Sequence, residues 1–242
     1  MVITEQFAQI IHPIFETLGY MFGFQYYLRQ RKRFPEPEVD AHGLWILLAV
    51  TSGALLFSRM IAVVEHVHLI NATTPLSFYT GQKTIVGGLL GGLVFVEIAK
   101  KILQIKKSTG DRMVKPLLSG MILGRIGCFL SGVYDGTHGK KTEFFLGVDL
   151  GDGVVRHPVQ LYEIVFLVVL FLFLSYIEKY NLKNGFLFQL FLASYLLFRF
   201  FVEFLKPVPV FVYGLSFIQI TCLVGICYYL ILFFTHRKKL YA

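Results

Sequence analysis

The amino-acid sequence predicts an all-α, polytopic membrane protein with about seven transmembrane helices. Three observations lead to this fold class: the chain is 55% hydrophobic and only 16% charged, its apolar residues gather in seven runs, and its basic residues cluster in alternate loops. A soluble domain carries about 25% charged residues. This chain of 242 residues therefore has too little polar surface to coat a water-soluble globule, which also excludes disordered and disulfide-scaffold proteins.

Each apolar run is long enough to cross a membrane, because a hydrocarbon core roughly 30 Å thick needs about 20 residues of helix. We expect spans at about 9–28, 43–64, 84–104, 115–133, 158–178, 185–205 and 213–235. The first run has no cleavage site of small residues, so it is interpreted as an anchor and not as a signal peptide. Turn-forming residues fill the breaks, as in FPEPEVDAHG and NATTPLSFYTGQK. We expect one integral-membrane domain over 1–242, with a short outer loop at about 134–157.

The basic residues predict the orientation of the chain. Fifteen lie in one set of alternate loops: Arg29, Arg31, Lys32, Arg33, Lys100, Lys101, Lys106, Lys107, Arg112, Lys115, Lys179, Lys183, Arg237, Lys238 and Lys239. Five lie on the other side: Lys83, Lys140, Lys141, Arg156 and Lys206. The positive-inside bias then places the N-terminus outside and the C-terminus in the cytoplasm. No soluble basic face is left for a nucleic acid, so the net charge of +8 is a topology signal.

Three further arginines, Arg59, Arg125 and Arg199, fall inside or close to the apolar runs. A central arginine costs about 2.5–3.5 kcal/mol on insertion scales, so each needs a partner or a polar cavity. Acidic partners are available in Glu65, Glu97, Glu163 and Glu203. Ion pairs that fix helix packing are the favoured interpretation for Arg59. For Arg125 and Arg199 an anion site is favoured, and packing remains the alternative.

Tyr195, Arg199 and Glu203 follow an i, i+4, i+8 spacing, so they share one helical face that should point inward. Arg125 lies in GMILGRIGCFLSGVYDG, where glycines thin the helix and allow a backbone or ligand to approach closely. These glycines include Gly120, Gly124 and Gly127. A planar guanidinium binds phosphate in a bidentate manner, which suggests an anionic headgroup near the outer face.

Two other segments add candidate residues. In RHPVQLYE, His157, Gln160, Tyr162 and Glu163 fall within two turns of a helix start, and His157 is either a base or a cap. In TIVGGLLGGLVFVE, the pairs Gly87–Gly91 and Gly88–Gly92 favour helix packing first and ligand approach second. His66 and His68 lack further ligands at a suitable spacing, so we expect neither a metal site nor a cofactor.

The segments GRIGCFLSGVYDG and RHPVQLYE, followed by the Tyr195–Arg199–Glu203 face, resemble those of prolipoprotein diacylglyceryl transferases in the same order. The resemblance covers most of the chain. It implies a multi-pass enzyme of the bacterial inner membrane whose partners are phosphatidylglycerol and lipobox-containing prolipoproteins. Such an enzyme moves the diacylglyceryl group to the lipobox cysteine thiol and releases glycerol phosphate.

The resemblance also implies roles for matching residues. Arg125 matches the arginine of the family's signature, and Arg199 matches the second essential arginine. The expected catalytic residues are Arg125, Arg199, His157, Tyr195 and Glu203. The expected substrate-binding residues are Gly124, Gly127, Gly136, Gln160, Tyr162, Glu163, Gly87 and Gly88. A shared phosphate site requires Arg125, Arg199 and His157 to converge on one cavity open to lipid.

The chain departs from the family pattern at three positions. Cys128 replaces the usual asparagine of the signature, Val133 replaces an acidic residue, and Val86 replaces the histidine of a third-span HGG segment. These departures leave two alternatives beside lipoprotein maturation. One is a related membrane transferase with a different acceptor, and the other is a non-catalytic lipid-binding paralogue.

Overall fold

The computed structural model describes residues 4–71, 74–180 and 182–238, which fold almost entirely as α-helices. The all-α fold class is therefore confirmed. The chain divides into two compact units. Unit 1 comprises the residues up to Pro35, Ser108–Phe191 and Phe204–Pro207, and unit 2 comprises Glu36–Lys107, Leu192–Glu203 and the residues from Val208 on.

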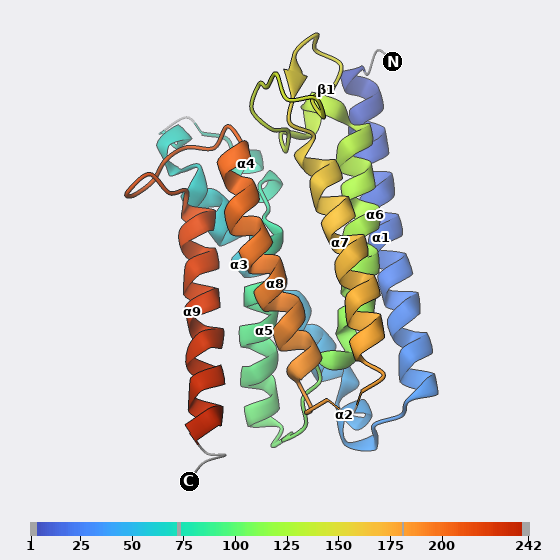
Figure 1. Ribbon diagram of the computed structural model, residues 1–242. Helices are drawn as coiled ribbons and strands as arrows, with labels where there is room; N and C mark the ends of the chain where they lie inside the picture. The colour runs from blue at the N-terminus through green and yellow to red at the C-terminus, as the bar shows by residue number, and fades with distance from the viewer. Residues whose placement is uncertain (1–3, 72–73, 181, 239–242) are drawn as a thin grey trace. The chain divides into compact units, whose positions relative to one another are not determined.

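Unit 1 is built on three long helices, α1 (Glu5–Arg33), α6 (Val114–Leu130) and α7 (Val159–Ile177), with α6 beside both others (Figure 1). Glycines let α1 and α6 touch backbone to backbone. A Cβ atom at Gly120 would lie 2.9 Å from the carbonyl oxygen of Gly19, and one at Gly127 would lie 2.5 Å from the Cβ of Phe15. The predicted thinning of the signature helix is thus used here for helix packing.

Unit 2 pairs α3 (Gly43–Glu65) with α5 (Ile85–Ile102), and α9 (Phe217–Lys238) contacts both. Gly53 and Gly91 face each other across the α3–α5 contact, so packing explains these glycines. Caps fix the helix starts: the Thr84 side chain accepts a hydrogen bond from the Gly87 amide, and Ser216 and Gln219 form a capping box on α9. Two short helices, α2 (Pro37–Ala41) and α4 (Leu76–Gly81), lie outside the predicted spans.

The remaining long helix, α8 (Phe186–Val202), begins in unit 1 and continues in unit 2. Its first turn is anchored within unit 1, because Asp111 accepts hydrogen bonds from the amides of Gly185 and Phe188, the latter at 2.8 Å. The chain then continues through the 3₁₀ turn η4 (Glu203–Leu205).

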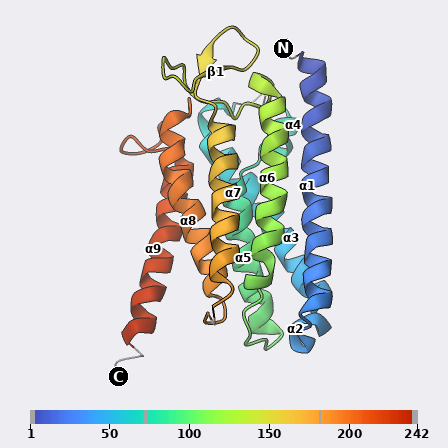
Figure 2. The same cartoon turned by 45° about the vertical axis from the view of Figure 1, so that its right-hand side comes forward.

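A two-stranded antiparallel sheet closes the end of unit 1 at which α7 begins (Figure 2). Strand β1 (Val148–Asp149) pairs with β2 (Val155–Arg156), with Val148 opposite Arg156. Asp149 accepts bonds from the amides of Gly151 and Gly153 and so shapes the tight turn between the strands. Arg156 bonds to Asp152 at 2.6 Å, and this bond lowers the pKa of the exposed Asp152 carboxyl below its ordinary value.

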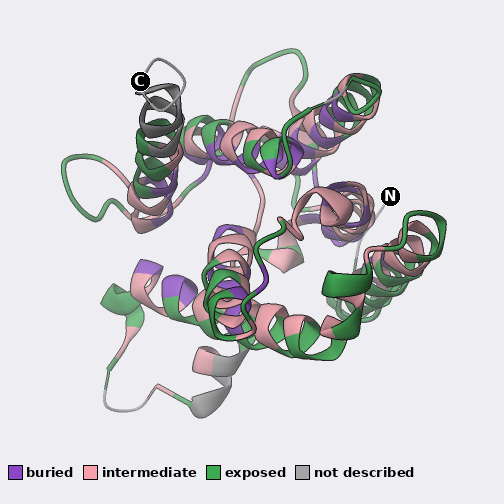
Figure 3. Ribbon diagram, turned by 90° about the horizontal axis from the view of Figure 1, so that it is seen from below, coloured by how far each residue is buried: buried purple, intermediate pink, exposed green. Residues whose placement is uncertain are grey.

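All seven predicted apolar segments form helices, and four of the described helices are long and apolar enough to cross a membrane. These are Gly43–Glu65, Asp111–Leu130, Val159–Ile177 and Phe186–Leu205. The described apolar part of α9, Phe217–Ile231, is shorter, polar residues such as Gln9 and Glu16 interrupt α1, and the charged residues Glu97, Lys100 and Lys101 lie in α5. Large apolar side chains such as Val165, Val169 and Leu172 are exposed on α7. Exposed residues, drawn in green in Figure 3, occur along many of the helices. Seven spans stay a prediction.

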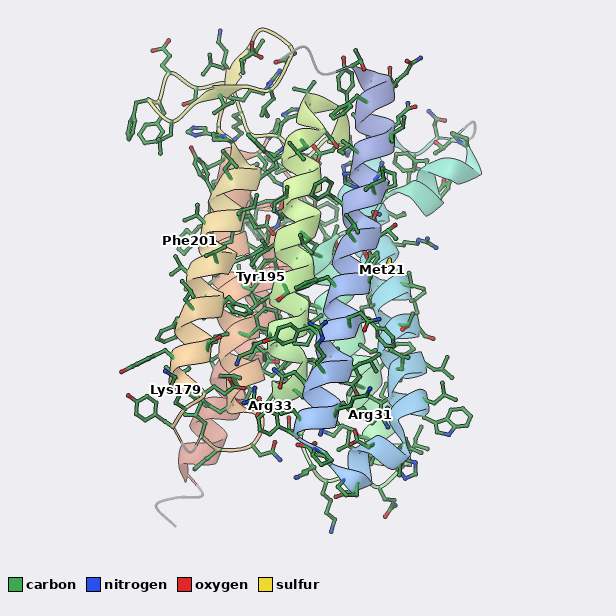
Figure 4. The ribbon with its side chains drawn as sticks, turned by 90° about the vertical axis from the view of Figure 1, so that its right-hand side faces the viewer. Met21, Arg31, Arg33, Lys179, Tyr195 and Phe201 are labelled. Atoms are coloured by element: carbon green, nitrogen blue, oxygen red, sulfur yellow. The ribbon has the colours of Figure 1, made fainter. Side chains whose placement is uncertain are left out.

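Basic residues gather at one end of unit 1. Arg31 and Arg33 at the end of α1 lie toward the same end as Lys179, which follows α7 (Figure 4). Arg112 donates a 2.8 Å bond to the carbonyl of Phe34, and Lys115 pairs with Glu178 at this same end. The orientation across a membrane stays a prediction, and Lys239, which contributed to it, lies outside the described residues.

Candidate functional site

The signature arginine forms a buried ion pair inside unit 1. The Nε atom of Arg125 on α6 lies 2.9 Å from Oε2 of Glu163 on α7, and the two side chains are 8% and 3% exposed. This pair joins the two predicted segments GRIGCFLSGVYDG and RHPVQLYE. A carboxylate held against a guanidinium at this depth offsets the cost of burying either charge. The structure thus brings Arg125 and Glu163 together, and this contact fits the packing interpretation as well as an anion site.

Cys128 and the turn after α6 complete the surroundings of Arg125. Nη1 of Arg125 donates to the Cys128 sulfur at 3.7 Å. The Ser131 hydroxyl donates to the carbonyl of Gly127 at 2.8 Å, and the chain then enters η3 (Gly132–Asp135). Gly136 ends η3 at φ +69°, in the left-handed region that favours glycine. The glycine requirement of the signature at this position is therefore conformational.

Gly124 differs from the other glycines of α6, since a Cβ atom there would meet no described atom within 4 Å. Gly124 precedes Arg125 directly in α6, and the helix surface at Gly124 itself is open. Gly127, by contrast, lies against Phe15 of α1 and serves helix packing. Of the two glycines expected to bind substrate in α6, only Gly124 has a surface suited to it.

The start of α7 carries His157, Gln160 and Tyr162. Pro158 is the N-cap residue of α7, and the Nδ1 atom of the half-buried His157 lies 3.3 Å from the Tyr162 hydroxyl. The His157 backbone is bonded to the loop over 134–157 through Gly139 and Lys140. Gln160 is 1% exposed, and its two amide atoms have no hydrogen-bond partner among the described residues. An unsatisfied buried amide is costly, which makes Gln160 a candidate contact for a bound polar group.

The second arginine forms the pair that its spacing predicts. In unit 2, Nη2 of Arg199 lies 2.7 Å from Oε2 of Glu203, and their side chains are 8% and 0% exposed. Tyr195 on the same face is fully buried, so the inward direction of this stripe is confirmed. Arg125 and Arg199 belong to different units, and their convergence on one phosphate stays a prediction.

Of the two third-span glycines expected to bind substrate, Gly87 serves helix packing and Gly88 makes no close contact. A Cβ atom at Gly87 would lie 2.5 Å from the carbonyl oxygen of Phe57 on α3, whereas one at Gly88 would make only ordinary contacts at 3.9 Å. Val86 is buried in the same turn and brings no titratable group. Arg59 is exposed on α3 and forms no ion pair within the described part of the chain, so the ion pair expected for it is wrong.

Sequence reasoning missed one cluster in unit 1. A ring nitrogen of His12, the sulfur of Cys128 and a carboxylate oxygen of Asp135 all lie within 4.8 Å of one another. These residues come from α1, α6 and η3, so no sequence spacing could reveal the group. Cys128, which stands where the resemblance leads one to expect asparagine, was the one available signal.

Comparisons with known proteins identify the family of the chain. The model of the family described as prolipoprotein diacylglyceryl transferase matches residues 6–235. A phosphatidylglycerol–prolipoprotein diacylglyceryl transferase of Nitratidesulfovibrio vulgaris is 31% identical over 222 residues, which cover 81% of each chain. Proteins of the same name from Dehalococcoides mccartyi and Bacillus cereus are each 28% identical, over 80% and 92% of this chain and 75% and 85% of theirs. The chain therefore belongs to the prolipoprotein diacylglyceryl transferase family, which is a family of transferases.

Proposed function

We propose that this protein transfers the diacylglyceryl group of phosphatidylglycerol to the lipobox cysteine of prolipoproteins, as one membrane domain of the bacterial inner membrane. The buried Arg125–Glu163 pair carries the proposal, because it holds the guanidinium of the signature arginine away from water, between α6 and the first turns of α7. Membership of the family supports the reaction type and both substrates.

In this reaction the acceptor thiolate attacks the glycerol carbon that bears the phosphate. A carbon–sulfur bond forms, the carbon–oxygen bond breaks, and its electron pair leaves with glycerol phosphate. Negative charge therefore accumulates on the leaving phosphate, and a preorganised guanidinium in a dry site stabilises it. We assign this role to Arg125, with Glu163 as the residue that orients its guanidinium.

The other predicted site residues take supporting roles. Gln160 would donate its buried amide to the glycerol phosphate headgroup, and Gly124 and Gly136 would let that headgroup approach the backbone. His157 and Tyr162 would contact the substrate near the loop over 134–157, and within unit 2 Arg199, held by its ion pair with Glu203 beside Tyr195, would carry a second buried positive charge. The positive-inside bias supports an outside N-terminus, which places the loop over 134–157 and the acceptor thiol on the periplasmic side.

Val86 favours a second candidate function. Because this buried valine stands where the family has a histidine, a protein that binds phosphatidylglycerol without transferring its diacylglyceryl group is the alternative. A transferase with another acceptor is consistent with the same replacement.

A complementation experiment separates these functions. Cells depleted of their own transferase should regain thioether-linked lipoprotein when they express this chain, and Arg125→Ala should abolish that rescue. Pure protein should also lipidate a lipobox peptide in phosphatidylglycerol micelles. Binding of phosphatidylglycerol with no product would establish the lipid-binding alternative instead.

A further inference from the structure

The His12–Cys128–Asp135 cluster of unit 1 has the donor set of a zinc site. Its three ligand atoms, one nitrogen, one sulfur and one oxygen, lie within 4.8 Å of one another. A tetrahedral zinc ion with bonds of about 2.0–2.3 Å holds its ligand atoms roughly 3.3–3.8 Å apart. Side-chain rotations that move these atoms by about one ångström would therefore complete the geometry. Nδ1 of His12 is buried and has no hydrogen-bond partner among the described residues, which leaves a nitrogen lone pair or proton to be satisfied.

The local fold holds the three ligands in place. Gly127 brings α1 close to α6, since a Cβ atom there would meet Phe15 and lie 3.6 Å from the His12 carbonyl oxygen. Two hydrogen bonds from Thr137 orient the Asp135 carboxylate. The Thr137 amide donates to one carboxylate oxygen at 3.0 Å, and the Thr137 hydroxyl donates to the other at 2.6 Å. Such bonds to a ligating carboxylate are the usual outer support of a metal site.

The charges around the cluster also fit a divalent cation. With Cys128 as a thiolate, Cys128, Asp135 and Glu163 carry three negative charges, and Glu16 adds a carboxylate 3.9 Å from Nε2 of His12. Arg125 supplies one positive charge, through its ion pair with Glu163 and its contact with the Cys128 sulfur. A divalent ion would offset most of this negative charge, which is costly to hold away from water.

We propose that His12, Cys128 and Asp135 bind a zinc ion whose fourth coordination position takes the thiolate of the acceptor cysteine; the identity of that acceptor rests on the function proposed above. Thiolate and imidazole donors select zinc over magnesium or calcium, and three protein ligands with one open position are typical of catalytic zinc. Coordination would lower the pKa of the incoming thiol, whose proton would pass to water. The zinc ion neither gains nor loses electrons when the thiolate attacks.

A zinc ion at this site would activate the acceptor thiol without the need for a general base. The cluster lies beside Arg125. The zinc ion that binds the attacking sulfur and the guanidinium that stabilises the leaving phosphate would therefore be neighbours.

Cobalt binding tests the proposal without any transfer reaction. Detergent-purified full-length protein, stripped of metal and given Co²⁺, should bind one ion per chain with a thiolate-to-cobalt charge-transfer band. A lipobox peptide added without phosphatidylglycerol should strengthen that band, and the same peptide with serine in place of its cysteine should not. Absence of the band in the unmodified protein would overturn the proposal, and a band unaffected by the cysteine peptide would overturn the role of the fourth position.

Variants locate the site. Cys128→Ser should remove the band, and His12→Asn and Asp135→Asn should each weaken Co²⁺ and Zn²⁺ binding by about 10-fold or more. Cys227→Ser and His68→Asn, at exposed positions of unit 2, are matched controls that should bind as the unmodified protein does. Thermal unfolding of each variant checks its fold. Equal binding by folded Cys128→Ser and unmodified protein would overturn the assignment.

The outcome is separable from the transferase proposal. A cobalt spectrum that responds to the cysteine peptide in a protein that fails complementation would retain the metal site and reject the transferase. Successful complementation by a protein that binds no metal would retain the transferase proposal and reject the metal site.

Discussion

At the scale of single residues, the buried Arg125–Glu163 pair gives a prediction for stability and one for the proposed chemistry. Glu163→Gln removes the carboxylate from a guanidinium that is 8% exposed. Loss of one member of a buried pair costs about 3–5 kcal/mol, so we expect a clear fall in the thermal midpoint of unfolding. Arg125→Met/Glu163→Leu should regain most of the stability, because no charge then remains buried, yet should not transfer lipid.

The exposed Arg156–Asp152 pair is the matched control for this experiment. It has a similar N–O distance, 2.6 Å, but lies at the surface, where solvent screens its attraction. Asp152→Asn should leave the thermal midpoint of the detergent-solubilised protein unchanged. Equal effects of Glu163→Gln and Asp152→Asn would contradict the importance given to burial.

The shape of the Arg125 side chain gives a second prediction at this scale. Arg125→Lys keeps the positive charge but loses the planar fork that binds a phosphate group in a bidentate manner. We expect the rate of lipobox-peptide lipidation to fall by about 10²–10³-fold, the range measured when one transition-state donor is removed. A rate within a factor of two of the unmodified protein would show that Arg125 acts only as a charge.

At the scale of helices, the α1–α6 contact provides a prediction with an internal control. A Cβ atom at Gly120 would press on the carbonyl oxygen of Gly19, which is backbone and cannot rotate away. Gly120→Ala should therefore lower the thermal midpoint. Gly124→Ala makes the same change one turn later, where no described atom lies within 4 Å, and should preserve or raise the midpoint through its better helix propensity.

Gly124→Ala also tests the open helix surface at this position. If phosphatidylglycerol approaches there, the added methyl should raise the KM for lipid while the protein remains folded. An unchanged KM would remove Gly124 from the binding site, and a midpoint as low as that of Gly120→Ala would contradict the packing analysis.

The helices also show which features are predictable from sequence. Hydropathy located all seven long helices, but it placed the start of α1 at about residue 9 instead of Glu5, since capping residues and charged turns extend a helix beyond its apolar part. The Arg199–Glu203 pair was predictable because both residues lie on one helix at i, i+4. The Arg125–Glu163 contact and the His12–Cys128–Asp135 cluster join separate segments, so only tertiary structure could reveal them.

At the scale of the whole molecule, the distribution of charge predicts which loops face the cytoplasm. Fifteen basic residues fall in one set of loops and five in the other, and within unit 1 Arg31, Arg33 and Lys179 lie toward one end (Figure 4). This asymmetry should place the segment between α5 and α6 inside and the 134–157 loop outside. Glu143→Cys and Lys107→Cys add a thiol at exposed positions of these two loops.

A membrane-impermeant maleimide should label Glu143→Cys in intact cells, whereas it should label Lys107→Cys only after the cells are lysed. Cys227→Ser in both proteins removes the exposed native thiol, and a protein carrying Cys227→Ser alone measures the remaining background. The proposed transfer reaction requires the Arg125 end of α6 to face outward, because the lipobox cysteine and this end of the helix must meet on one side of the membrane. Labelling of Lys107→Cys in intact cells would invert the topology and place the acceptor thiol on the wrong side for this site.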